Sequence, residues 1–171
     1  SQQDTTEIPH ARARRIMRVL FLSQYLAQEP LGVMYLSGAL KQAGHETKMI
    51  FLPDTHFEQK AKEFDPAVVA FSFTTGQHVI SHGIMRQVKK LLPDAITLAG
   101  GAHVTVVPEF IEEDSVDAIC RGEGEGAVVE LCNVIESGGD PTKVGNIWFK
   151  DAEGVVHKNE PRPLLQDIDN E

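Results

Sequence analysis

Three short segments combine small residues with hydroxyl, carboxylate or imidazole side chains, and each follows an apolar run. They are Ser72-Phe-Thr-Thr-Gly76, Gly100-Gly101-Ala-His103 and Arg121-Gly-Glu-Gly-Glu125. Glycine lets a ligand approach the backbone, and hydroxyl groups can hydrogen-bond to it. Each segment also has a structural explanation, because paired glycines suit a turn and Thr75 or Gly76 suits a helix N-cap. Glu123 and Glu125 could act in acid–base chemistry, but we interpret them as favourable charges at a helix N-terminus.

The sequence lacks the residues that several common kinds of binding site require. No lysine follows a glycine run, as a phosphate-binding loop requires. Gly122-Glu-Gly-Glu-Gly126 follows the fifth apolar run rather than the first, and its carboxylates would repel a pyrophosphate. Cys120 and Cys132 form no C-x-x-C pair, so neither a structural zinc site nor an iron–sulfur cluster is expected. His78 and His82 are one helical turn apart, and without a third ligand nearby we interpret them as an exposed helix face.

Strands and helices alternate along the chain. Short apolar runs predict strands at 18–23, 47–52, 67–72, 95–99 and 116–120. Apolar residues at helical spacing predict helices at 32–43, 57–64, 77–92, 108–113 and 127–137, with Gly44 and Gly138 as stops. Two further runs, 146–150 and 155–158, flank a glycine-containing turn and predict a β-hairpin.

This order of elements predicts the fold class and a domain organisation. Apolar strands that are each followed by a helix indicate a parallel sheet covered on both faces. We therefore expect a doubly wound α/β domain, flavodoxin-like or Rossmann-like, with a five-stranded parallel sheet and a C-terminal β-hairpin. The expected divisions are a leader tail at 1–17, the α/β domain at 18–140, the hairpin appendage at 141–159 and a linker at 160–171.

Composition limits the partners. The 171 residues carry a net charge of −9, which argues against non-specific binding to nucleic acid. No apolar run is long enough to span a membrane, and the first 18 residues lack the apolar core of a signal peptide. Two cysteines suggest no disulfide framework, so we expect a reducing, cytoplasmic location.

Taken together, several sites resemble the cobalamin-binding domain that precedes the catalytic domain in cobalamin-dependent radical S-adenosylmethionine enzymes. The resemblance runs from about Arg18 to Asp169. Its most specific part is Gly-Gly-x-His after the fourth strand combined with Gly-Glu-Gly-Glu after the fifth. The other matching segments are Pro30-Leu-Gly32, Ala43-Gly-His-Glu46, Asp65-Pro-Ala-Val-Val-Ala-Phe-Ser72, Pro108-Glu109 and Val116-Asp117.

The resemblance implies that cobalamin lies over the carboxyl ends of the strands, where open parallel sheets bind ligands. Its nucleotide tail would enter a slot beside Gly100 and Gly101, lined by Ser72 and Thr74. His103 would be a hydrogen-bond partner rather than a metal ligand. The implied cofactor-binding residues are Tyr25, Gln28, Leu31, Gly32, Ser72, Thr74, Thr75, Gly76, Gly100, Gly101, His103, Gly122, Glu123, Gly124 and Glu125.

Two departures from the wider family matter. The methionine-synthase and mutase relatives carry D-x-H-x-x-G after the first strand, and its histidine ligates cobalt; here that loop has no histidine. Asp54-Thr-His56 follows the second strand instead, so we interpret His56 as a surface residue at a helix start. Second, the C-x-x-x-C-x-x-C of a radical module is absent. The sequence is then either a fragment of a longer parent chain, which we favour, or a freestanding carrier. In the fragment, the [4Fe–4S] cluster and S-adenosylmethionine would belong to a downstream domain.

Three hypotheses remain open at this stage. The first is a cobalamin-binding module that presents the cofactor to a radical S-adenosylmethionine domain, for methyl transfer. The second is a degenerate domain that keeps the fold without the cofactor and acts in structure or docking. The third is a flavodoxin-like domain that binds a flavin or a nucleotide, although the loop after the first strand lacks a Ser/Thr/Gly run for a phosphate.

Overall fold

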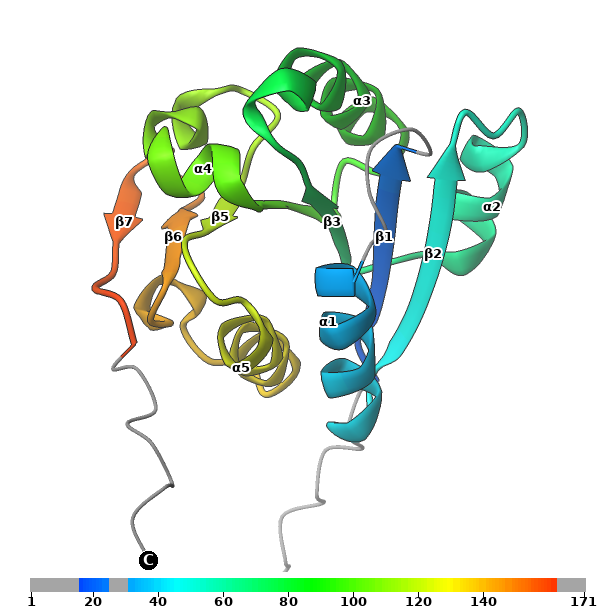
Figure 1. Cartoon of the computed structure of the whole chain (residues 1–171). Coiled ribbons are helices and arrows are strands. Elements are labelled where there is room, and N and C mark those ends of the chain that lie inside the picture. Colours follow the sequence, from blue (N-terminus) through cyan, green and yellow to red (C-terminus); the bar gives the residue numbers. More distant parts are fainter. Residues whose placement is uncertain (1–15, 25–30, 163–171) are drawn as a thin grey trace, which may run out of the picture.

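The computed structural model describes residues 16–24 and 31–162, in which strands and helices alternate (Figure 1). The strands are β1 (Arg18–Gln24), β2 (Glu46–Leu52), β3 (Val68–Ser72), β4 (Ile96–Gly100), β5 (Ala118–Cys120), β6 (Ile147–Lys150) and β7 (Val156–Lys158). The helices are α1 (Leu31–Gln42), α2 (Phe57–Phe64), α3 (His78–Leu91), α4 (Ala102–Val106) and α5 (Glu125–Glu136). Short 3₁₀ turns span Thr75–Gln77, Pro108–Glu112 and Pro141–Lys143.

The described strands form one sheet in the order β2-β1-β3-β4-β5-β6-β7. Strands β1 to β5 are parallel, and β6 and β7 are antiparallel additions beside β5. The predicted α/β class, with a parallel sheet and a C-terminal hairpin, is therefore confirmed. The chain passes from β1 outward to β2 and then returns past β1 to β3. This change of direction makes the carboxyl edge between β1 and β3 the topological switch point, where ligands bind in such sheets.

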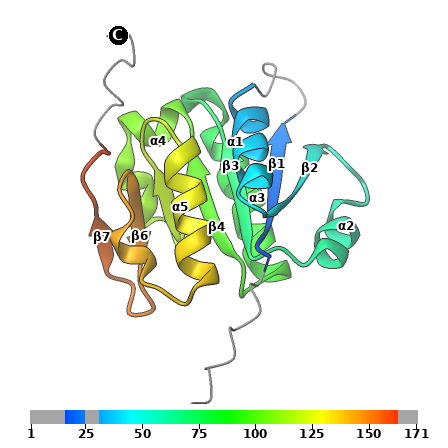
Figure 2. The same ribbon diagram turned by 90° about the horizontal axis from the view of Figure 1, so that it is seen from below.

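Helices cover both faces of the sheet, so the core has two halves. Figure 2 shows α1 and α5 side by side over one face. Alternate residues of a strand point to opposite faces, and β1 illustrates this. Phe21 packs in the cluster beneath α1 and α5, whereas Leu20 and Leu22 pack with residues of α2 and α3. Each fully buried leucine of this kind contributes roughly 2 kcal/mol to stability.

The predicted helix stops are confirmed at two glycines. Gly44 (φ +91°) ends α1, and its N–H donates to the carbonyl of Lys41. Gly138 (φ +72°) follows α5, and its N–H donates to the carbonyl of Ile135. Both lie in the left-handed region that glycine adopts at no steric cost.

The segment after Gly101 departs from the expected loop, because Ala102–Val106 is the helix α4. Two valines and a threonine give this five-residue stretch low helix propensity, so the pattern does not indicate a helix. Helix α5 begins at Glu125, two residues before the predicted start at 127.

The ends of the described chain give no test of the predicted domain boundaries, which stay predictions. The hairpin is continuous with the sheet, since Ala118 of β5 pairs with Phe149 of β6. None of the helices in the described ranges is long and apolar enough to cross a membrane.

Candidate functional site

The carboxyl ends of β3, β4 and β5 bring the predicted binding segments to one edge of the sheet. Ser72 at the end of β3 lies in register with Gly100 at the end of β4. The glycine–glutamate segment follows β5 and leads into α5. Segments that are distant in the sequence therefore meet where the fold predicts a ligand.

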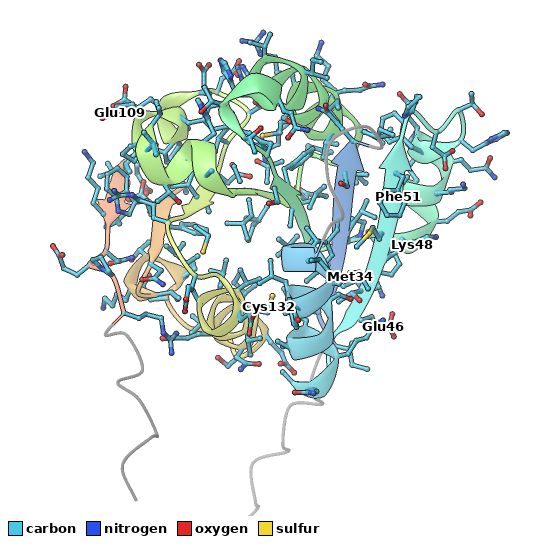
Figure 3. All side chains as sticks on the ribbon, in the orientation of Figure 1. Met34, Glu46, Lys48, Phe51, Glu109 and Cys132 are labelled. Atoms are coloured by element: carbon cyan, nitrogen blue, oxygen red, sulfur yellow. The ribbon has the colours of Figure 1, made fainter. Side chains whose placement is uncertain are left out.

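A cavity of about 500 Å³, which we call the slot, lies between the sheet and helices α1 and α5. Phe21, Ala70 and Leu98 line it from the sheet, and Leu36 and Val128 line it from the helices. Its interior is thus apolar. Its remaining lining residues are Gly32, Val33, Phe71, Ser72, Gly100, Gly101, Cys120, Gly122, Glu123, Gly124, Glu125 and Gly126. Figure 3 shows the side chains between α5 and the sheet, with Cys132 of α5 labelled.

A second cavity of about 300 Å³, which we call the rim cavity, adjoins the slot across the strand ends. The two share Gly32, Val33, Phe71, Ser72 and Gly101. The rim cavity is more polar, and Gln24 Nε2 donates to Ser81 Oγ at 3.2 Å within its lining. Its other lining residues are Leu22, Ser23, Leu52, Phe73, Thr74, Gln77, Ile84 and Ala102.

Gly100 and Gly101 are glycines for different reasons. Gly101 has φ +95°, and a Cβ atom built on it would lie 2.6 Å from the Phe73 carbonyl oxygen. The same atom on Gly100 would meet only the Phe71 carbonyl oxygen, at 3.7 Å, which is an ordinary contact. Gly100 is two residues after Leu98 and so shares its face of the sheet, toward the slot. A larger side chain at Gly100 would therefore occupy slot volume, whereas one at Gly101 would collide with β3.

Thr105 on α4 joins two glycine segments, and sequence reasoning missed it. Its hydroxyl donates to the Gly101 carbonyl at 3.1 Å and accepts from the Gly122 N–H at 3.2 Å. Because α4 was not expected, nothing in the sequence indicated that position 105 faces both loops.

Glu123 and Glu125 lie among the slot-lining residues at the start of α5, as the helix-dipole interpretation expects. Asn146 holds this segment from the hairpin side: its Nδ2 donates to the Glu123 carbonyl at 3.0 Å. Asn146 has φ +66° and also accepts from the Arg162 N–H through Oδ1, at 2.5 Å. It is a second positioning residue that the sequence did not indicate.

His103 is buried behind the rim rather than lining either cavity. Its ring stacks on His78 with centroids 4.5 Å apart, and its Nδ1 lies 3.2 Å from Thr75 Oγ1. Burial, and then the neighbouring His78, lower the pKa of His103. In this position a neutral His103 ring can hydrogen-bond to the hydroxyl group of Thr75.

The remaining predicted residues divide into three groups. Thr74 lines the rim cavity and is the N-cap of the 3₁₀ turn, with its N–H donating to Gln77 Oε1 at 3.2 Å. Thr75, Gly76 and the exposed Leu31 line neither cavity. Tyr25 and Gln28 lie outside the described residues.

Apart from the carboxylates of Glu123 and Glu125, the described side chains that line the two cavities are neutral. Of the described residues that line the two cavities, none is a lysine, an arginine or a histidine. Burial raises the pKa of the Cys120 thiol to about 12, so this sulfur stays protonated at neutral pH. Hydroxyls, backbone groups and apolar walls therefore dominate, which fits a large ligand with an apolar body and amide groups better than a compact phosphate.

Comparison with known proteins identifies a family whose model matches most of the chain. A family model described as "B12 binding domain" matches residues 17–132. The chain is 31% identical over 147 residues to a protein of Pyrococcus horikoshii named "Uncharacterized methyltransferase PH0819", with 82% of this chain and 32% of the relative covered. It is 30% identical over 149 residues to an "Anaerobic magnesium-protoporphyrin IX monomethyl ester cyclase" of Synechocystis, with 82% and 30% covered.

Among solved structures, the fold is similar to that of the cobalamin-dependent S-adenosylmethionine radical enzyme OxsB with aqua-cobalamin and S-adenosylmethionine bound. The TM-score is 0.74 at 20% sequence identity, and the match covers 86% of this chain and 22% of that one. This likeness concerns the fold. The chain spans about a third of the length of the curated relatives it matches.

Proposed function

The chain belongs to the B12-binding domain family, and on this premise we propose that it holds cobalamin at the carboxyl edge of its sheet, with the nucleotide tail in the slot. The observation that carries this proposal is the slot itself. Gly100 lines it at the carboxyl edge of the sheet, and its walls are the apolar residues of the sheet and of α1 and α5. An extended tail ending in a flat aromatic base needs a deep apolar cavity of this kind.

The polar groups at the edge suit the amide fringe of the macrocycle. Ser72 reaches both cavities, and Thr74 lines the rim cavity beside it. Such hydroxyls and the backbone groups of the glycine segments can donate to and accept from amides without a net charge. Their part is to fix the orientation of the macrocycle over the strand ends.

We infer that the chain holds cobalamin without a histidine below the cobalt. Among the described residues no histidine lines either cavity, and residues 25–30, which follow β1 in the sequence, include no histidine. We therefore expect bound cobalamin to be base-off and without histidine coordination. The absorption spectrum of the complex, and the absence of nitrogen splitting in the electron paramagnetic resonance spectrum of its cob(II)alamin form, would check this expectation.

When bound, cobalamin supplies a cobalt centre that can accept a methyl group and pass it on; the protein binds and orients it. We propose that the upper face is presented to a radical S-adenosylmethionine domain of the same parent chain, for methyl transfer. A methyltransferase among the relatives and a radical enzyme among the structural neighbours support this assignment.

A glycine substitution tests the slot without disturbing the backbone. Gly100→Leu should place a side chain in the slot and abolish retention of hydroxocobalamin on gel filtration. Gly83→Leu is the matched control, because Gly83 is exposed on α3 with open space around its Cβ position. Full retention by a folded Gly100→Leu protein would refute the tail assignment. Failure of the unaltered chain to retain the cofactor would favour a degenerate domain.

A further inference from the structure

A cluster of potential metal ligands lies away from both cavities, where α3 meets the segment that leads into β5. It consists of His82 on α3 and of Glu113 and Asp114, which follow the 3₁₀ turn Pro108–Glu112. One ligand atom from each lies within 4.8 Å of the others. The three side chains come from two separate elements, so the fold rather than local sequence assembles them.

His82 Nε2 makes no hydrogen bond to either carboxylate, and its distances to them suit a shared ion. His82 Nε2 lies 3.4 Å from Glu113 Oε2 and 3.7 Å from Asp114 Oδ1. A charge-assisted hydrogen bond between such atoms is about 2.7–2.9 Å long. Ligand atoms that sit about 2.0–2.2 Å from a tetrahedral Zn²⁺ are roughly 3.4 Å apart.

The imidazole nitrogen has no other partner. His82 Nε2 is buried and makes no hydrogen bond, although the two carboxylates are its neighbours. The ring is held in place by an edge contact with Phe110, with centroids 5.7 Å apart. A buried polar nitrogen without a partner is costly, and coordination of a metal ion is one way to satisfy it.

The surrounding charges leave room for an ion. Glu113 and Asp114 bring two negative charges, and their side chains are 46% and 80% exposed, so solvent can reach a fourth position. Arg86 Nε lies 3.6 Å from Asp114 Oδ1, on an exposed side chain. Lys150 Nζ donates to the backbone carbonyl of Glu113 at 2.9 Å, and its charge also interacts with the Glu113 and Asp114 carboxylates.

We propose that His82, Glu113 and Asp114 form a site for one divalent ion of the zinc class, which fastens α3 to the segment entering β5. One imidazole and two carboxylates are a ligand set that Zn²⁺ accepts, with water as the fourth ligand. The site is independent of cobalamin, because none of its residues lines either cavity.

The test is a Zn²⁺ titration of the chelator-treated chain by isothermal calorimetry, without cobalamin. We expect one saturable site and a rise in the melting temperature on adding Zn²⁺. His82→Gln should abolish both. His157→Gln is the matched control and should retain both, because His157 Nε2 is already bonded to Asp151 Oδ2 at 2.6 Å.

A second variant distinguishes a true loss of Zn²⁺ binding from misfolding of the His82 variant. Glu113→Gln changes a half-exposed side chain and should also abolish Zn²⁺ binding with little loss of stability. The proposal is overturned if the unaltered chain shows no saturable binding. It is equally overturned if His82→Gln or Glu113→Gln binds Zn²⁺ as the unaltered chain does. Neither outcome bears on the cobalamin assignment.

Discussion

Gly101 lies so close to Phe73 that a Cβ atom on it would stand 2.6 Å from the Phe73 carbonyl oxygen and 2.9 Å from its backbone nitrogen. The His103 N–H also reaches the Phe73 carbonyl, at 3.4 Å. The start of α4 is thereby packed directly against the end of β3, beside Ser72. This contact, rather than a ligand, explains why position 101 must be glycine.

Gly101→Ala should therefore destabilise the fold itself. The positive φ and the collision together should cost about 2 kcal/mol or more. Gly100→Ala is the matched control, with an expected change below about 1 kcal/mol, because its added methyl makes an ordinary contact. Urea unfolding of both variants measures the difference. Equal stabilities would show that β3 and α4 do not pack as described.

Thr105→Val should weaken cobalamin retention while the fold survives. The substitution keeps the shape but removes the hydroxyl that joins Gly101 to Gly122. Because the Thr105 side chain is exposed, each lost hydrogen bond should lower the free energy of unfolding by at most about 1 kcal/mol. Equilibrium dialysis with hydroxocobalamin measures the effect on affinity. Thr105→Ser, which keeps the hydroxyl, should bind as the unaltered chain does, and equal binding by the valine variant would contradict the account.

Asn146→Ala should be more harmful than Asn146→Gly. Both remove the side-chain bonds to Glu123 and Arg162, but only alanine also opposes the positive φ. We expect the alanine variant to lose roughly 1 kcal/mol more than the glycine variant in thermal or urea unfolding. If the two variants were equally stable, the left-handed backbone at this residue would be in doubt.

The buried thiols should make stability fall in alkaline solution. Burial raises the pKa of Cys120 and of Cys132 to about 12, above the ordinary value of 9.0. The folded state then binds more protons than the unfolded state between pH 9 and pH 12. The thiol contribution is fully present below pH 9 and is lost as the pH rises through that interval.

Unfolding by urea at pH 8, 9 and 10 measures this fall. A variant with alanine at both positions should be less stable at pH 8, because each substitution leaves a cavity, but its stability should fall less steeply with pH. The remaining slope belongs to other groups. An unchanged slope would mean that the thiols ionise as readily in the folded protein as in the unfolded chain.

Much of the fold could be predicted because burial leaves a simple signature. The run Val68–Ser72 is nearly continuous in apolar residues since both faces of β3 are covered. The glycines that end α1 and α5 could also be predicted from the sequence. Helix α4 could not, because its valines and threonine disfavour a helix, and its contacts with β4, β5 and the Pro108–Glu112 turn hold it in place.

The site was predictable at the strand ends and not beyond them. Ser72, Gly100 and the glycine–glutamate segment converge because parallel strands share a carboxyl edge. Thr105 was missed because α4 was not expected, and Asn146 was missed because its partners Glu123 and Arg162 are distant in the sequence. His82 was interpreted as part of an exposed face, yet its side chain is only 13% exposed and meets Glu113 and Asp114 from another element.

The most direct measurement is a crystal structure of this chain with bound hydroxocobalamin. We expect the nucleotide base to lie in the slot, between Leu98 of β4 and Val128 of α5, and no histidine to ligate the cobalt. A nucleotide base found outside the slot, or a histidine bound to the cobalt, would show that this prediction is wrong.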